Sequence, residues 1–165
     1  MKAVVVYESL WGNTAAVAWA IAEGLGPDTV VLSTAEATPE ALAEVDLLVV
    51  GAPVHGFTVP TAQSLENIKA NAAKAPTPPD LSQPAMRSWL ESLSPGKGRA
   101  AAFDTRVRGP FGSGAGRIEK ALAAAGYRPL AKARGFIVQG RYGPLREGEL
   151  ERAQAWGAEL ARLMR

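Results

Sequence analysis

The chain is 165 residues long, the size of one domain, and its 47% hydrophobic and 21% charged residues are typical of a globular protein. It has no cysteine, which excludes disulfides, thiolate zinc sites and cysteine nucleophiles, and its net charge of +2 without a basic block does not indicate nucleic-acid binding. No apolar stretch approaches the roughly 20 residues of a membrane-spanning helix, and the apolar run after Lys2 is too short for a signal peptide. We therefore expect a single cytoplasmic domain over residues 1–165, with no membrane span.

Strands and helices alternate along the sequence. Short runs rich in β-branched residues predict buried strands, and apolar residues spaced four apart predict helices. In chain order we expect a strand at Lys2–Tyr7, a helix at Ala15–Leu25, a strand at Thr29–Leu32, a short helix at Pro39–Glu44, a strand at Asp46–Val50, a helix at Met86–Leu93, a strand at Arg99–Phe103, a helix at Gly116–Gly126, a strand at Ala131–Gln139 and a helix at Glu149–Met164. Trp19, Trp89 and Trp156 fall on these helices, and we expect them to pack in the core.

The segment between the third and fourth strands differs from the rest. Residues 60–85 contain five of the 12 prolines and an Ala/Lys-rich stretch, which predicts a long connection with a helical turn around Leu65–Lys69. A connection of this length inside a compact domain is uncommon and tends to be functional or mobile.

Five strands separated by helices predict an α/β fold, a single doubly wound parallel sheet covered by helices on both faces. In such folds, ligands bind outside the carboxyl ends of the strands, where the strand order reverses. The candidate site therefore consists of the loops after strands one, three and four, which are Glu8–Thr14, Gly51–Thr61 and Asp104–Ala115.

The first of these loops carries the strongest signal. Its residues are Ser9, Leu10, Trp11, Gly12, Asn13 and Thr14, which place two hydroxyls and a run of backbone N–H groups at the start of a helix. Unpaired N–H groups and the helix dipole favour an anion there, so the loop is a candidate phosphate site. The residues alone leave a second interpretation open, in which Asn13 or Thr14 only caps the helix and Gly12 only permits a tight turn.

The segment from Val5 to Thr14, continuing to Ala18 and Ile21, resembles the flavodoxin signature. The resemblance implies a flavodoxin-like sheet with strand order 2-1-3-4-5, in which the first loop binds the phosphate of FMN and two later loops bracket the isoalloxazine ring. Two features depart from that family. Many flavodoxins have a hydroxyl residue at the position of Trp11, and those that carry electrons are usually strongly acidic.

The same resemblance assigns roles to the other two loops. Pro53, Val54, His55, Gly56 and Phe57 would flank the flavin; His55 or Phe57 could stack on the ring, and the Gly56 peptide could rotate to offer its carbonyl to flavin N5–H. The simpler interpretation is a glycine turn with a surface histidine and a core phenylalanine. A single histidine also cannot supply a multi-histidine metal site, so no metal is expected.

In the third loop, Asp104, Thr105 and Arg106 would contact the pyrimidine edge of the flavin, with Arg106 stabilising negative charge on the reduced ring. An aspartate that caps the turn beside a solvated arginine is the alternative. Ser9, His55 and Asp104 could also be imagined as a hydrolytic triad, but the chain has no Gly-x-Ser-x-Gly nucleophile elbow at Ser9.

These observations favour an FMN-binding electron-transfer protein that exchanges electrons with a redox partner protein or a small-molecule acceptor. Two alternatives remain open. One is a flavodoxin-fold oxidoreductase acting on a quinone or porphyrinogen-like substrate. The other is a regulatory or binding domain of the same fold that has lost the flavin.

Overall fold

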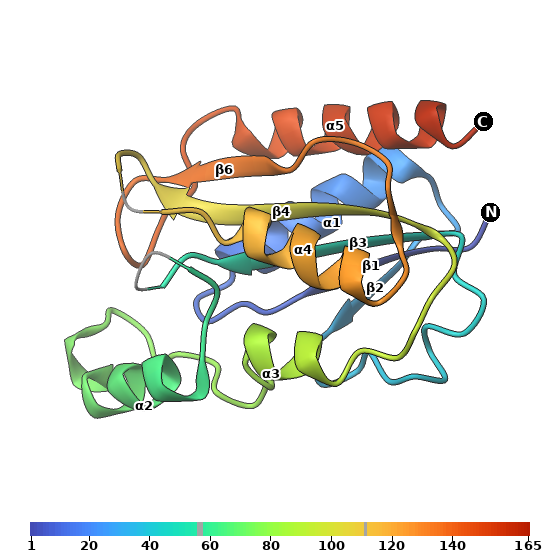
Figure 1. Cartoon of the computed structure of the whole chain (residues 1–165). Coiled ribbons are helices and arrows are strands. Elements are labelled where there is room, and N and C mark those ends of the chain that lie inside the picture. Colours follow the sequence, from blue (N-terminus) through green and yellow to red (C-terminus); the bar gives the residue numbers. More distant parts are fainter. Residues whose placement is uncertain (56–57, 111) are drawn as a thin grey trace.

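The computed structural model describes residues 1–55, 58–110 and 112–165 and is built on one parallel sheet (Figure 1). The strands are β1 (Ala3–Tyr7), β2 (Val30–Ser33), β3 (Leu47–Pro53), β4 (Arg99–Val107), β5 (Arg128–Pro129) and β6 (Arg134–Val138). Their order is β2-β1-β3-β4, and β5 and β6 both pair with β4, at its beginning and its end. The predicted doubly wound fold and strand order are therefore confirmed, and the two-residue β5 is an addition to the predicted set.

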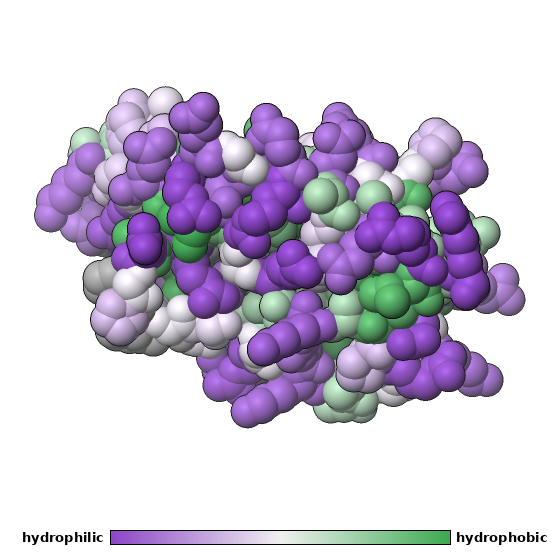
Figure 2. Space-filling view, turned by 90° about the horizontal axis from the view of Figure 1, so that it is seen from above, coloured by the Kyte–Doolittle hydropathy of each residue, from purple (hydrophilic) through white to green (hydrophobic). Residues whose placement is uncertain are grey.

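Helices cover both faces of the sheet. They are α1 (Asn13–Leu25), α2 (Ala62–Ala70), α3 (Met86–Glu91), α4 (Ala115–Ala124) and α5 (Glu149–Leu163), with a 3-10 turn at Ala72–Lys74. In Figure 1, α1 and α5 lie on one face of the sheet, α3 and α4 lie on the other, and α2 projects beyond the layers. The outer surface above α5 is mostly hydrophilic, with small apolar patches (Figure 2).

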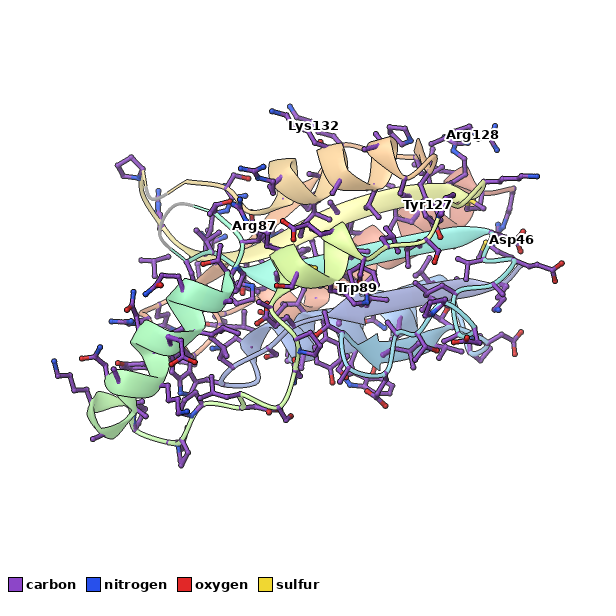
Figure 3. All side chains as sticks on the ribbon, turned by 60° about the horizontal axis from the view of Figure 1, so that its bottom comes forward. Asp46, Arg87, Trp89, Tyr127, Arg128 and Lys132 are labelled. Atoms are coloured by element: carbon purple, nitrogen blue, oxygen red, sulfur yellow. The ribbon has the colours of Figure 1, made fainter. Side chains whose placement is uncertain are left out.

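The two faces of β1 explain the two halves of the core. Val4 and Val6 point toward α3 and α4, whereas Val5 points toward α1 and α5, and all three are at most 1% exposed. This alternation is the period-2 pattern of a strand buried on both sides. Figure 3 shows Trp89 of α3 and Tyr127, which follows α4, on the first of these faces.

The tryptophans follow this arrangement with one exception. Trp89 and Trp156 are buried as predicted, and Trp156 lies 6.2 Å from the ring of Phe136. Trp19 is 56% exposed, so its predicted place in the core is wrong. It lies two positions from both Val17 and Ile21, which are fully buried, and two positions along a helix turn a side chain to the opposite side.

The predicted helix at Pro39–Glu44 is also wrong. Thr38 accepts a hydrogen bond from Ala41 N at 3.3 Å, as a cap would, but the segment closes only turns. Glu44 has a φ of 56°, a left-handed conformation that ends the turn and redirects the chain into β3 three residues later.

Residues 60–85 contain more regular structure than the sequence predicts. The helix α2 has nine residues and starts with a capping box, in which Thr61 Oγ1 accepts from Ser64 N at 3.1 Å and Ser64 Oγ accepts from Thr61 N at 2.8 Å. After α2 the chain returns along the sheet edge to α3.

Two glycines let α1 and α5 approach closely. A Cβ added to Gly24 of α1 would overlap the backbone oxygen of Gln154, and one added to Gly157 of α5 would overlap that of Ile21. Because both obstacles are backbone atoms, a larger residue can be accommodated only if the helices move apart.

We therefore expect Gly157→Ala to lower the free energy of unfolding by about 1–3 kcal/mol, the usual cost of overpacking. The matched control is Gly116→Ala in α4, where an added Cβ meets nothing within 4 Å and helix propensity predicts a gain of up to about 1 kcal/mol. Chemical denaturation of both variants measures the difference, and equal stabilities would contradict the close approach.

Candidate functional site

A pocket of about 230 Å³ lies at the carboxyl-terminal edge of the sheet. It is lined by Ser9, Leu10, Trp11, Asn13, Thr14, Pro53, Val54, His55, Thr105, Arg106, Val107, Val138 and Arg141. Ten of the predicted site residues are among these, drawn from three loops far apart in the sequence. Gly12 and Asp104 are not, and Gly56 and Phe57 lie outside the described residues.

The loop of residues 9–14, called the phosphate loop after the role that the sequence predicts for it, leaves several backbone donors unpaired. Gly12 adopts a φ of 91°, and its N–H donates to Ser9 Oγ at 3.1 Å, which closes a tight turn. Within the described part of the chain, the N–H groups of residues 10, 11, 13, 14 and 15 have no hydrogen-bond acceptor. These are the donors that the beginning of a helix leaves unpaired, and together they form a concave site for an anion.

Thr14 lies beneath these donors and is 2% exposed. Its Oγ1 shares a hydrogen bond of 2.8 Å with Thr105 Oγ1 of β4, so the two hydroxyls fix each other's position. Gly12 rather than Asn13 or Thr14 occupies the cap position of α1, and no side chain caps the helix. Neither Asn13 nor Thr14 therefore caps the helix, whereas Gly12 does make the tight turn that the alternative interpretation also expected.

The segment 77–83 supports the phosphate loop on one side. Gln83 Oε1 accepts from Ser9 N at 2.9 Å, and Asp80 N donates to Leu10 O at 2.8 Å. The indole Nε1 of Trp11 donates to Thr77 O at 3.1 Å. The long connection therefore fixes the shape of the loop, and none of these three partners could be found from motif spacing.

The segment 140–143, between β6 and α5, supports the loop on the other side. Asn13 Nδ2 donates to Tyr142 O at 3.2 Å, and the rings of Trp11 and Tyr142 meet edge to face with centroids 4.8 Å apart. Gly143 packs so closely that an added Cβ would lie 2.7 Å from Asn13 Oδ1. This contact brings Arg141 to the pocket.

Asp104, Thr105 and Arg106 are placed differently from the prediction. They belong to β4, which continues to Val107, and not to a loop that follows the strand. Asp104 is fully buried and accepts from Gly114 N and Ala115 N, both at 3.0 Å, and from Arg106 Nε at 2.6 Å. Its carboxylate therefore holds the start of α4 and neutralises Arg106, which agrees with the capping interpretation for Asp104.

The loop after β3 is closed by reciprocal hydrogen bonds between His55 and Thr58, at 2.6 and 3.0 Å. Val54 N donates to Thr105 O at 3.0 Å and ties the loop to β4. Burial, with a smaller contribution from Arg141, lowers the pKa of His55 to about 4, so its imidazole is neutral at pH 7.

The sequence of residues 5–156 matches the model of the flavodoxin family, which is most of the chain. The chain belongs to the flavodoxin family. No curated protein matches it in sequence. Inferences from similarity therefore rest on the family and not on a close relative.

Solved structures agree with this assignment at the level of the fold. A flavodoxin from the domain Archaea has a TM-score of 0.67 and 21% identity, with 99% of each chain covered. Flavodoxin 2 from Bacillus cereus has a TM-score of 0.71 and 16% identity, covering 98% of this chain and 99% of that one. A WrbA-like flavodoxin from Agrobacterium tumefaciens has a TM-score of 0.60 and 17% identity, covering 99% and 96%.

Two further findings apply to residues 1–55, 58–110 and 112–165. None of their helices is long and apolar enough to cross a membrane. No group of three or more His, Asp or Glu side chains among them could hold a metal ion.

Glu8, which precedes the phosphate loop, is a fully buried carboxyl group. Its Oε1 accepts from Met86 N at 2.8 Å, and Oε2 has no partner in the described structure. Burial raises the pKa of Glu8 to about 8, against a smaller lowering by the Met86 N–H. This chain therefore carries a protonated carboxyl group beside the phosphate loop at neutral pH.

This burial predicts the pH dependence of stability. Because the folded state binds the Glu8 proton more tightly than the unfolded state, the stabilisation is complete below about pH 4.5 and is lost as the pH rises to about 8. Glu8→Gln keeps the acceptor for Met86 N and removes this loss. We expect the stability difference between variant and wild type to shift in the variant's favour by up to roughly 5 kcal/mol between pH 4.5 and pH 8.

Denaturant unfolding at several pH values measures this shift. Glu66→Gln, at an exposed position of α2, is the control and should give a curve parallel to that of the wild type. A Glu8→Gln curve that also runs parallel would show that Glu8 ionises normally.

Proposed function

We propose that the protein binds FMN without a covalent bond and carries electrons. The observation that supports this most strongly is the phosphate loop and the start of α1, where five backbone N–H groups have no acceptor among the described residues, beside a pocket that two other loops complete. A terminal phosphate is the group that such a set of donors at a helix start fits best.

The residues divide the pocket into a polar and an apolar part. Ser9 and Thr14 would donate their hydroxyls to the phosphate, together with the N–H groups of the loop. Val54, Val107 and Val138 supply the apolar lining on the side of β3, β4 and β6. FMN supplies the redox chemistry when bound, and the protein orients it and sets the charge and solvent around it.

His55 and Arg106 add little charge to this pocket. His55 is neutral at pH 7, so its ring can lie against an aromatic ligand without the cost of burying a cation. Arg106 is paired with Asp104, which leaves its charge balanced while its Nη2 also approaches Ser113 Oγ at 3.3 Å. Neither of these two residues therefore places an unbalanced charge against a flavin ring.

The nature of the electron acceptor separates a carrier from an enzyme. A carrier exchanges electrons with a redox partner protein, whereas a flavodoxin-fold oxidoreductase reduces a small quinone-like molecule directly. Mixing the FMN-loaded protein with reduced nicotinamide and a quinone distinguishes the two. We expect slow oxidation of the nicotinamide, and rapid turnover would instead support the enzyme.

The first binding prediction concerns the choice of ligand. The protein should bind FMN more tightly than riboflavin, which lacks the phosphate, and more tightly than FAD, in which that phosphate is part of a diester. Calorimetric titration of the apoprotein with the three flavins measures the order. Equal or tighter binding of riboflavin would contradict the phosphate site.

The second binding prediction concerns the contribution of the Ser9 and Thr14 hydroxyls to FMN affinity. A hydrogen bond to a charged phosphate contributes roughly 1.5–3 kcal/mol, so Ser9→Ala and Thr14→Ala should each weaken FMN binding by about 10- to 100-fold and leave riboflavin affinity nearly unchanged. Thr14→Ser keeps the hydroxyl and serves as the matched control. An FMN-to-riboflavin ratio that survives both alanine substitutions would show that neither hydroxyl contacts the phosphate.

A further inference from the structure

The pocket contains two guanidinium groups, and only one of them is balanced by a carboxylate. Arg106 Nε and Nη2 donate to the two oxygens of Asp104 at 2.6 and 2.7 Å. Arg141 makes no salt bridge within the described residues, and no aspartate or glutamate lines the pocket. Its charge is therefore available to a ligand.

The phosphate loop has no charge of its own to offer. Its donors are backbone N–H groups and the hydroxyls of Ser9 and Thr14, all of which are neutral. Trp11 could contribute only its indole N–H, and this group donates to Thr77 O. A phosphate monoester carries nearly two negative charges at pH 7, which exceeds the partial positive charge of a helix start, so a cationic side chain nearby would add to its binding.

Arg141 is held where it can do this. Its guanidinium lies 5.8 Å from the ring centroid of Tyr142, and that ring packs against Trp11. The carbonyl of Tyr142 accepts from Asn13, so both contacts attach this segment to the phosphate loop itself. Trp11, which has no hydroxyl to give, is thus the residue that brings a guanidinium to the site.

We propose that Arg141 binds the phosphate monoester in this pocket and supplies the counter-charge that the phosphate loop lacks. The proposal rests on the proposed function, because the phosphate is taken to be that of FMN. Guanidinium groups bind phosphate oxygens through short, charge-assisted hydrogen bonds that are about twice as strong as neutral ones. Arg141 is therefore a residue that determines specificity for a phosphorylated flavin.

The effect of Arg141 on His55 supports its orientation toward the pocket. Burial is the main cause of the low pKa of His55, and the positive charge of Arg141 lowers it further. Arg141 and His55 line the same pocket as residues of the phosphate loop, so the guanidinium lies near both loops.

The test compares FMN and riboflavin binding by calorimetry in four apoproteins. These are the wild type, Arg141→Gln, Arg141→Lys and Arg128→Gln. Arg128→Gln removes the same charge at the other end of β4. Arg128 belongs to β5, whose backbone pairs with that of β4 at Arg99, and Figure 3 labels its side chain. Since β4 spans nine residues, Arg128 lies roughly 25 Å from the pocket.

We expect Arg141→Gln to weaken FMN binding by 10- to 100-fold, or about 1.4–2.8 kcal/mol, and to change riboflavin affinity less than twofold. Arg141→Lys should keep most of the FMN affinity, and Arg128→Gln should equal the wild type. The FMN affinity of the wild type should also fall more steeply with salt than that of Arg141→Gln, because one charge pair is lost.

A wild type that prefers FMN, with the same preference in Arg141→Gln, would overturn the role of Arg141 and leave the proposed function intact. A wild type that binds riboflavin as tightly as FMN would overturn both. Competition with inorganic phosphate tests whether the guanidinium binds the phosphate group itself. If inorganic phosphate displaces FMN at millimolar concentration from the wild type and equally from Arg141→Gln, the guanidinium does not bind phosphate. If Arg141→Gln alone resists this competition, the assignment is supported.

Discussion

The site depends on keeping five backbone N–H groups, those of residues 10, 11, 13, 14 and 15, free of acceptors among the described residues. A chain that leaves a buried strand normally pairs its backbone groups at once, because an unpaired buried donor is costly. Here the carbonyl of Leu10 and the side chains of Trp11 and Asn13 are bonded to residues outside the loop, which are Asp80, Thr77 and Tyr142. The donors that remain face the pocket, and both the 60–85 connection and the segment before α5 are placed to maintain this arrangement.

Three buried carboxyl groups near this edge differ in the hydrogen bonds that they accept. Asp104 accepts five hydrogen bonds and anchors the start of α4. For Glu149, burial alone would raise the pKa, but bonds from Arg152, Ile137 N and Arg146 outweigh it and lower the pKa to about 2. Glu8 has one N–H partner and stays protonated at neutral pH. The first two carboxylates fix loops through their charge, whereas Glu8 lies beside the phosphate loop without repelling an anion.

Much of this arrangement could be predicted from local patterns. Runs of β-branched residues predict the buried strands. The hydroxyls and glycine of residues 9–14 predict the phosphate loop, because the residues that would form it are adjacent in the sequence. The loop after β3 could be located in the same way. The predictions that were wrong concern features that depend on contacts with distant parts of the chain. The turns at Pro39–Glu44 replace a helix because the chain must enter β3 at once, and Asp104 leaves the predicted loop because β6 extends β4.

Arg141 and Gln83 could not be found from the sequence for a related reason. Gln83 bonds to Ser9 N and Arg141 lines the same pocket, both from far along the chain, and neither belongs to a motif with fixed spacing. The resemblance to flavodoxins drew attention to Trp11 as a residue without a hydroxyl. Only the structure shows that its ring packs against Tyr142, next to Arg141, and that its indole N–H donates to Thr77 O.

The long sequence separations between contacting residues also limit how early the site can form while the chain is being synthesised. The contacts that shape the phosphate loop join Trp11 to Thr77 and Asn13 to Tyr142, 66 and 129 residues apart. A growing chain that has produced β1 and α1 therefore has the loop sequence without the loop geometry, because pairing distant segments requires both to be present. The pocket can be complete only after the segment before α5 has been made. The site therefore cannot assemble until most of the chain exists, although its most recognisable residues are among the first to be made.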